Sequence, residues 1–134
     1  MPPIYTRQWI ILPQNLMLSN KMDSYKTGLL SELFACVYLM LHGFRIIRRR
    51  YITGRHTGRA EIDIIAKRGN LVAFIEVKHR KTVNAAWGAI TTAQQRRLRL
   101  AAETFLLQKK WTDDARFDVI IIHGLHIDWI KNAF

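Results

Sequence analysis

Residues 60–78, with the sequence AEIDIIAKRGNLVAFIEVK, place charged side chains inside two otherwise apolar segments. Both segments have the length and apolar content of buried strands, and residues 67–70 between them are typical of a turn. A buried carboxylate is costly unless it is paired or bound to a metal, so Asp63 and Glu76 need partners. The pattern therefore predicts a β-hairpin that carries two carboxylates.

The alternation of side chains along a strand predicts where these groups lie. Glu76 and Lys78 share one face, about 6–7 Å apart. With residues 67–70 as a four-residue turn, Asp63 lies opposite Phe74, and Glu76 is its diagonal neighbour, within about 7–8 Å. A one-residue shift of register would turn Asp63 to the other face. At this separation the two carboxylates can share a Mg²⁺ or Mn²⁺ ion, while Lys78 steadies an anion or a water, which favours a metal-dependent nuclease.

The composition favours a nucleic-acid partner. The 134 residues suit one domain, and a hydrophobic content of 49% is enough for a folded core. The chain has 21 Lys and Arg against 10 Asp and Glu, and its formal net charge of +11 attracts polyanions. A single cysteine, Cys36, excludes an internal disulfide, and no apolar run reaches the roughly 18 residues of a membrane span. We expect a cytoplasmic protein without membrane association.

The chain divides near residue 24. Residues 1–23 hold all three prolines and show no clear periodicity, which predicts an N-terminal arm that is disordered, loosely packed, exchanged in a dimer or in contact with nucleic acid. A short strand at residues 9–12 is the one element expected there. Residues 24–42 are predicted to form a helix, because apolar residues recur at positions 30, 33, 34, 37, 38 and 41. On this helix Glu32 either faces the metal site as a third acid, or is exposed or paired with an arginine.

The rest of residues 24–134 predicts an α/β fold with a mixed sheet of four or five strands flanked by helices. A second helix is expected at residues 87–109, with Leu98, Ala101, Ala102 and Phe105 on its core face. The strands are expected at residues 44–52, 60–67, 71–78, 116–123 and 127–130. The strand at 116–123 is apolar on both faces and is therefore predicted to be central. Within it, Asp118 is expected to pair with Arg116 or to cap the entry of the strand rather than to bind metal.

Basic side chains surround the predicted hairpin. They lie on the strand before it, in a glycine-containing loop at residues 53–59, directly after Lys78, and on the second helix. We expect these groups to contact phosphates without reading bases; they are Arg48, Arg49, Arg50, Arg55, Arg59, Arg80, Lys81, Arg96 and Arg97. Gln94, early in the second helix, is a candidate to orient a water or a phosphate, with a plain surface role as the ordinary alternative.

Several motifs, in order, resemble a known family. The chain resembles the YraN family of bacterial proteins over residues 24–134, and more distantly the restriction endonuclease-like nuclease superfamily, which carries an Asp followed by Glu or Asp, x, Lys. The matching residues are Gly28, Glu32, Gly43 and Phe44, then EIDIIA at 61–66, FIEVKHR at 74–80, RFDVI at 116–120 and NAF at 132–134.

The resemblance implies a restriction endonuclease-like fold and a role for each matching residue. Asp63 and Glu76 would bind the metal, with the carbonyl of Val77 as a third ligand. Lys78 would position the attacking water and stabilise the charge that develops on the phosphate.

The resemblance also bears on three residues outside this core motif. Glu32 matches the first-helix acid of archaeal Holliday-junction resolvases in the same superfamily, which makes it a candidate ligand and catalytic residue. Ala60 stands where the family usually has glycine, and Gln94 stands where a basic residue is common. Neither departure removes a ligand.

The expected function is Mg²⁺- or Mn²⁺-dependent hydrolysis of DNA phosphodiesters, with DNA favoured over RNA. By analogy, cleavage would be selective for junctions or flaps and would be carried out by a homodimer. Two alternatives stay open. One is a nucleic-acid-binding module that lacks turnover, and the other is a basic ribosome-associated protein in which Glu76 and Lys78 form a structural ion pair.

Overall fold

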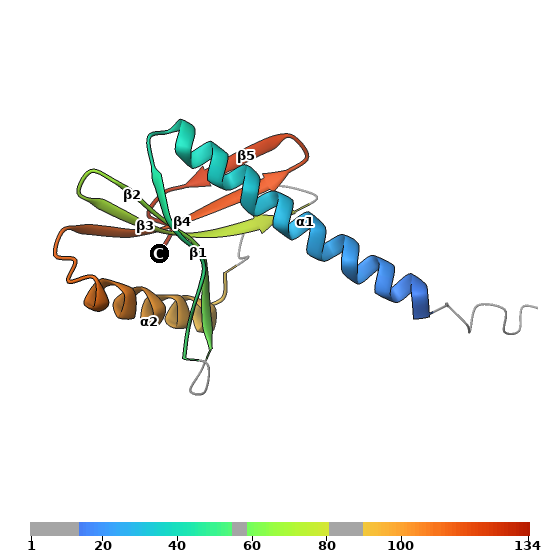
Figure 1. The fold of residues 1–134 in the computed structure, drawn as a ribbon, viewed down its shortest axis with the longest axis horizontal. Coiled ribbons are helices and arrows are strands. Elements are labelled where there is room, and N and C mark those ends of the chain that lie inside the picture. The colour runs from blue at the N-terminus through green and yellow to red at the C-terminus, as the bar shows by residue number, and fades with distance from the viewer. Residues whose placement is uncertain (1–13, 55–58, 81–89) are drawn as a thin grey trace, which may run out of the picture.

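The computed structural model describes residues 14–54, 59–80 and 90–134, with side chains from residue 25 onward. One five-stranded sheet lies between two helices (Figure 1). The elements in chain order are α1 (Gln14–Leu41), β1 (Arg45–Thr53), β2 (Ala60–Arg68), β3 (Leu71–His79), α2 (Thr92–Gln108), β4 (Asp114–His123) and β5 (His126–Ile130). The strands lie side by side in chain order, and β3 and β4 form the parallel pair. The α/β class and the mixed sheet are as predicted, and they are consistent with a restriction endonuclease-like fold.

Two apolar layers hold the helices against the sheet. On one face α1 packs on a core that includes Ile64, Ile75 and Ile120. On the other face α2 packs through Leu98, Ala101, Ala102 and Phe105, which confirms its predicted core face. The strand predicted to be central, β4, is buried on both faces and lies between β3 and β5, but it is the fourth of the five strands, and the central one is β3.

The helix α1 begins ten residues earlier than predicted, so residues 14–23, which we assigned to an irregular arm, are helical. The reason is local. Pro13 precedes the first helical residue, where proline is tolerated, and no proline or glycine follows until Gly28. The strand expected at residues 9–12 lies outside the described residues.

Five of the six apolar residues that predict α1 are exposed, and the sixth, Tyr38, packs against the core on the sheet. Met40 is exposed beside the five. We name the six exposed residues the α1 stripe: Leu30, Leu33, Phe34, Val37, Met40 and Leu41. The helix instead buries a face made mostly of smaller or polar residues, Ser31, Glu32, Ala35, Cys36 and Leu39. Small side chains let the helix axis approach the sheet closely, which explains the choice of face.

The turn of the β2–β3 hairpin has two residues, Gly69 and Asn70, so the predicted four-residue turn was wrong. Gly69 has φ +57°, a left-handed conformation that glycine adopts without strain and that tight hairpin turns require. The register runs from Arg68 opposite Leu71 to Ile64 opposite Ile75. It differs from the predicted register by two residues. Because two is even, every side chain keeps the face of the sheet that was predicted for it. One residue beyond the pair of Ile64 and Ile75, the same register places Asp63 across from Glu76 instead of Phe74.

Candidate functional site

The strands β2 and β3 separate at Asp63. Their last pair is Ile64 with Ile75; beyond it, β2 continues against β1 while β3 continues against β4. At this fork the carboxylate of Asp63 accepts a hydrogen bond from the backbone N–H of Val77, with Oδ2 and N 2.8 Å apart. The side chain thus satisfies a backbone donor that lacks its strand partner, and it is held beside the Glu76–Lys78 segment.

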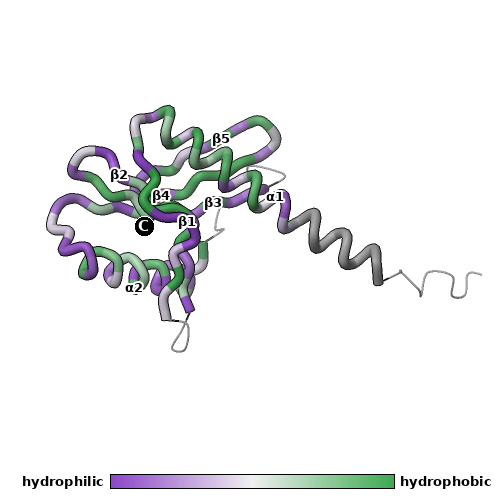
Figure 2. Tube along the Cα trace, in the orientation of Figure 1, coloured by the Kyte–Doolittle hydropathy of each residue, from purple (hydrophilic) through white to green (hydrophobic). Residues whose placement is uncertain are grey.

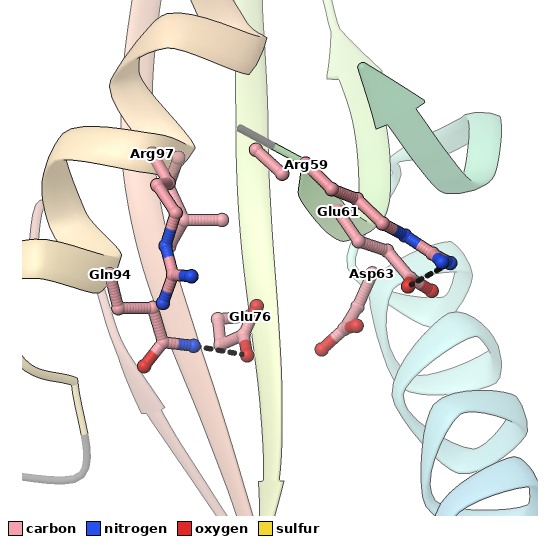
Figure 3. A pocket seen from close by; sticks show the side chains of 8 residues that line it. Arg59, Glu61, Asp63, Glu76, Gln94 and Arg97 are labelled. Carbon is pink, nitrogen blue, oxygen red and sulfur yellow. Dashed lines mark hydrogen bonds and ion pairs between the residues drawn. The ribbon is translucent and has the colours of Figure 1, made fainter. Parts of the chain in front are cut away.

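Glu76 projects from β3 into the same space (Figure 3). Its side chain is buried, and its Oε1 lies 3.1 Å from Lys78 Nζ and 3.1 Å from Gln94 Nε2. The predicted proximity of Glu76 and Lys78 on one face is therefore present. Gln94 comes from the first turns of α2, and it orients the carboxylate of Glu76 directly.

The electrostatics of the fork are unfavourable to two negative charges. Burial, and then the charge of Glu76, raise the pKa of Asp63 from 3.8 to about 7, although the N–H of Val77 and the ammonium of Lys78 act in the opposite direction. Burial also raises the pKa of Glu76, and this is opposed by Lys78 and by a hydrogen bond with Asp63. The N–H of Val77 and the ammonium of Lys78 therefore offset only part of the negative charge of Asp63 and Glu76. A bound cation beside the two carboxylates would be stabilised by the remaining charge.

A cleft of about 280 Å³ opens over these carboxylates. Its acidic floor is bordered by Arg59 and Arg97, two exposed arginines that sit on opposite sides in Figure 3. The N-terminus of α2 lies at this edge, where Thr91 caps the helix by accepting the N–H of Gln94. Arginines and a helix N-terminus both favour an anion, so the cleft can accept a phosphate above its carboxylates.

The donor set fits Mg²⁺ or Mn²⁺. Asp63 and Glu76 supply two carboxylates, and the carbonyl of Val77 follows directly in the chain. Within residues 25–54, 59–80 and 90–134, no group of three or more His, Cys, Asp and Glu side chains is placed to hold a metal. Mg²⁺ commonly uses one or two carboxylates and completes its octahedron with water and substrate phosphate oxygens, so two are sufficient.

Glu32 is not among the residues that line the cleft, and its carboxylate pairs with two arginines of β1. Arg50 donates to both of its oxygens, from Nε at 3.1 Å and from Nη2 at 3.3 Å, and Arg49 Nη2 lies 3.7 Å away. Of the alternatives that the sequence left open for Glu32, the structure shows the pairing with an arginine, and the Glu32 side chain is buried. The charge of Glu32 still contributes to the raised pKa of Asp63. Glu32 thus anchors two arginines instead of lining the cleft.

The remaining predicted phosphate contacts are dispersed. Arg48 is exposed on the edge strand β1, and Arg96 is exposed on α2. Arg80 donates to the carbonyl of His79. Arg55 and Lys81 fall outside the described residues. Of the predicted basic set, Arg59 and Arg97 are therefore the described members that line the cleft.

Sequence analysis missed two features of the site. Glu61 lines the cleft and pairs with Arg59 at 3.8 Å, a position two residues before Asp63 that strand alternation could have suggested. Arg50 has φ +51°, and it stands across from Asp63 because its neighbours Arg49 and Tyr51 pair with Ile64 and Ile62. No sequence signal marks this left-handed residue, which directs its guanidinium toward α1.

Asp118 is a structural carboxylate, as predicted. It is fully buried, and it accepts hydrogen bonds from Arg116 Nε at 2.9 Å, from Trp129 Nε1 at 2.9 Å and from the backbone N–H of Asn132 at 3.0 Å. These three donors join β4, β5 and the C-terminal segment.

Comparison with known proteins identifies the relatives of this chain. The family model described as "Uncharacterised protein family UPF0102" matches residues 31–122. A UPF0102 protein of Rhodopseudomonas palustris (strain HaA2) is 38% identical over 105 residues, which are 77% of this chain and 79% of that protein. One from Chromohalobacter salexigens is 35% identical over 124 residues, covering 88% and 98%. One from Bartonella bacilliformis is 41% identical over 105 residues, covering 77% and 83%. These matches extend across both carboxylate strands, and the chain belongs to the UPF0102 family, the YraN-like family that its motifs resemble.

Proposed function

We propose that this protein is a metal-dependent nuclease that hydrolyses DNA phosphodiesters. One observation carries the proposal: Asp63 and Glu76 meet at the fork of the hairpin under a cleft of about 280 Å³, with their negative charge incompletely compensated. A structural ion pair between Glu76 and Lys78 would be complete without the carboxylate of Asp63. With Asp63 present, the charge of Glu76 raises the pKa of Asp63. A divalent cation shared by two carboxylates makes that arrangement favourable.

Each residue of the fork has a distinct role in this proposal. Asp63 and Glu76 would hold Mg²⁺ or Mn²⁺ together with the Val77 carbonyl. A metal bound there lowers the pKa of a coordinated water and offsets the charge of the phosphate. Lys78, 3.1 Å from Glu76, is positioned to donate to that water or to a phosphate oxygen. Gln94 fixes the rotamer of Glu76.

The borders of the cleft supply binding without base recognition. Arg59 and Arg97, which line the cleft, would bind the phosphates on either side of the scissile bond. Phosphate contacts position the nucleic acid and carry no sequence information. Glu32 acts as a positioning residue, because it fixes Arg49 and Arg50 on β1 beside the fork. Selectivity would then arise from the shape of the DNA, such as a junction or flap.

The deciding experiment is cleavage of a labelled panel: linear duplex, single strand, flap, four-way junction and RNA. Each substrate is incubated with Mg²⁺ or Mn²⁺ and with wild type, Asp63→Asn, Glu76→Gln or the control Glu103→Gln, which changes an exposed carboxylate on α2. We expect cleavage by wild type and control, loss of at least 100-fold in both fork variants, and none with EDTA. Cleavage unchanged in the fork variants, or no cleavage of any substrate, would refute the proposal.

One observation favours a second candidate, a basic ribosome-associated protein in which Glu76 and Lys78 form a structural ion pair. Glu76 Oε1 is shared by Lys78 and Gln94 at 3.1 Å each, a geometry that also suits a purely structural ion pair. In that case Glu76→Ala would lower the free energy of unfolding and leave metal affinity unchanged. In the nuclease, the same variant would change stability little in metal-free buffer and would abolish the stabilisation that Mg²⁺ gives.

A further inference from the structure

The α1 stripe is a large apolar surface on the outside of the molecule. Its six side chains are between 47% and 80% exposed. Figure 2 shows hydrophobic residues along the C-terminal half of α1, which lies on the sheet face opposite α2. Among the described residues, none of the three apolar cores includes a member of the stripe. A helix that buries Ser31 and exposes Phe34 has its larger apolar face available for another surface.

The stripe carries no charge. From Leu29 to Leu41 the one charged residue is Glu32, and it points inward to Arg49 and Arg50. A polyanion would therefore find no cation on this surface, although the chain as a whole has a net charge of +11. Nucleic acid is drawn to the arginines on β1 and at the cleft instead, and the α1 stripe needs an apolar partner.

The size of the stripe suits a symmetric contact. Six large side chains about half exposed present on the order of 600 Å² of mostly apolar surface, at the upper end of the patches found on monomers. Two such patches in contact would bury about 1,200 Å², the lower bound for a stable protein interface. The helix axis of α1 continues past the sheet at its N-terminal end, so a neighbouring helix can lie along it without meeting the sheet (Figure 1).

We propose that a second copy of this chain covers the α1 stripe in an isologous homodimer. Positions 30, 33, 37 and 40 alternate steps of three and four residues, and positions 34 and 41 widen the same seam. That spacing is the one through which helices interdigitate. A two-fold contact requires a surface that complements itself, and an uncharged stripe meets its own copy without the like-charge repulsion that the arginine-bearing faces would cause.

The dimer leaves the candidate site open. The cleft over Asp63 and Glu76 is lined by Gln94 and Arg97 of α2, whereas the α1 stripe lies on the other face of the sheet. Each protomer would therefore present its own cleft to solvent. The inference stands on the surface of α1 and does not depend on the proposed nuclease function.

Sedimentation velocity over a series of protein concentrations tests the dimer. We expect wild type to sediment at twice the 15.7 kDa of one chain, and Leu33→Glu to weaken association at least 100-fold. The second variant is Leu41→Glu. Because Leu41 is 80% exposed, we expect the fold of the monomer to tolerate a glutamate at this position. The matched control is Leu107→Glu on α2, which is 79% exposed and should remain dimeric. Circular dichroism confirms that each variant is folded.

Three results would overturn the proposal. The first is a wild-type monomer at every concentration, as expected if another part of the same chain covers the stripe. The second is a dimer that both stripe variants leave intact. The third is a monomer that binds phosphatidylcholine vesicles in wild type but not in Leu33→Glu, which would assign the α1 stripe to a lipid surface.

Discussion

Replacing Asp63 by asparagine should stabilise the metal-free protein at neutral pH. Burial and the charge of Glu76 raise the pKa of Asp63 from 3.8 to about 7. Asparagine has nearly the same shape, and its side-chain oxygen can still accept the N–H of Val77. The substitution thus removes the charge while it keeps the hydrogen bond of the fork.

The sign of the pH dependence follows from the direction of this shift. Between about pH 4 and pH 7 the folded protein binds more protons at Asp63 than the unfolded chain does, so the free energy of unfolding falls as pH rises. A pKa that moves from 3.8 to about 7 corresponds to at most about 4 kcal/mol. Local relaxation and water lower this value, and we expect about 2 kcal/mol at pH 8.

Urea unfolding followed by tryptophan fluorescence, in EDTA from pH 4.5 to 8, measures this difference. Asp63→Asn should exceed wild type by about 2 kcal/mol at pH 8 and match it within about 0.5 kcal/mol at pH 4.5. The exposed control Glu103→Gln should show no such dependence. Adding Mg²⁺ should stabilise wild type and leave the variant unchanged. A difference that stays constant across pH, or a variant less stable than wild type at pH 8, would refute the reasoning.

Three further substitutions follow from single contacts. Asp118→Asn should cost about 3 kcal/mol in urea unfolding, because it leaves the guanidinium of Arg116 without its anionic partner. Arg50→Met should cost about 2 kcal/mol by the same measurement, because it removes both hydrogen bonds to the buried Glu32. Arg97 lines the cleft, and the proposed function gives it one phosphate contact; Arg97→Ala should therefore weaken DNA binding and reduce the slope of log K against log salt by about one, measured by fluorescence anisotropy between 50 and 200 mM salt.

Each of these has a matched control. Asp128→Asn changes an exposed carboxylate and should cost under about 1 kcal/mol. Arg48→Met removes an exposed arginine two residues from Arg50 and should change stability by less than about 0.5 kcal/mol. Lys26→Ala removes an exposed cation on α1, away from the cleft, and should leave the salt slope unchanged. Equal effects in variant and control would contradict the contact at issue.

The strands and the two carboxylates were predictable from the sequence because a buried sheet imposes a simple pattern. The apolar runs predicted the first residue of four of the five strands to within one residue. The alternation of side chains correctly predicted that Glu76 lies beside Lys78. The turn length was not predictable from composition alone, since residues 67–70 are polar throughout and two of them continue the strands. The wrong turn length shifted the predicted register by two residues. Because two is even, each side chain was still assigned to its correct face, and the prediction that the two carboxylates share a face was unaffected.

The orientation of α1 could not be predicted from periodicity. The sequence marks a stripe of large apolar residues, and such a stripe usually faces the core. Here the sheet requires close approach, which Ser31 and Ala35 allow, so the larger residues point outward. The partner of Glu32 was equally hidden, because Arg50 reaches it through a left-handed backbone conformation that ordinary residues in strands rarely adopt.

Two aspartates in this sheet show what separates a structural carboxylate from a candidate ligand. Among the described residues, Asp118 receives hydrogen bonds from Arg116, Trp129 and the backbone of Asn132, so its charge is matched by donors on three sides. Asp63 accepts the N–H of Val77 and faces a second carboxylate; burial, and then the charge of that carboxylate, raise the pKa of Asp63 to about 7. Asp118 is fully buried and Asp63 is partly buried, so burial does not single out Asp63 as the candidate ligand; what distinguishes Asp63 is the balance of charge around its oxygens. That imbalance, and not the presence of acids in the sheet, favours a bound divalent cation at the fork.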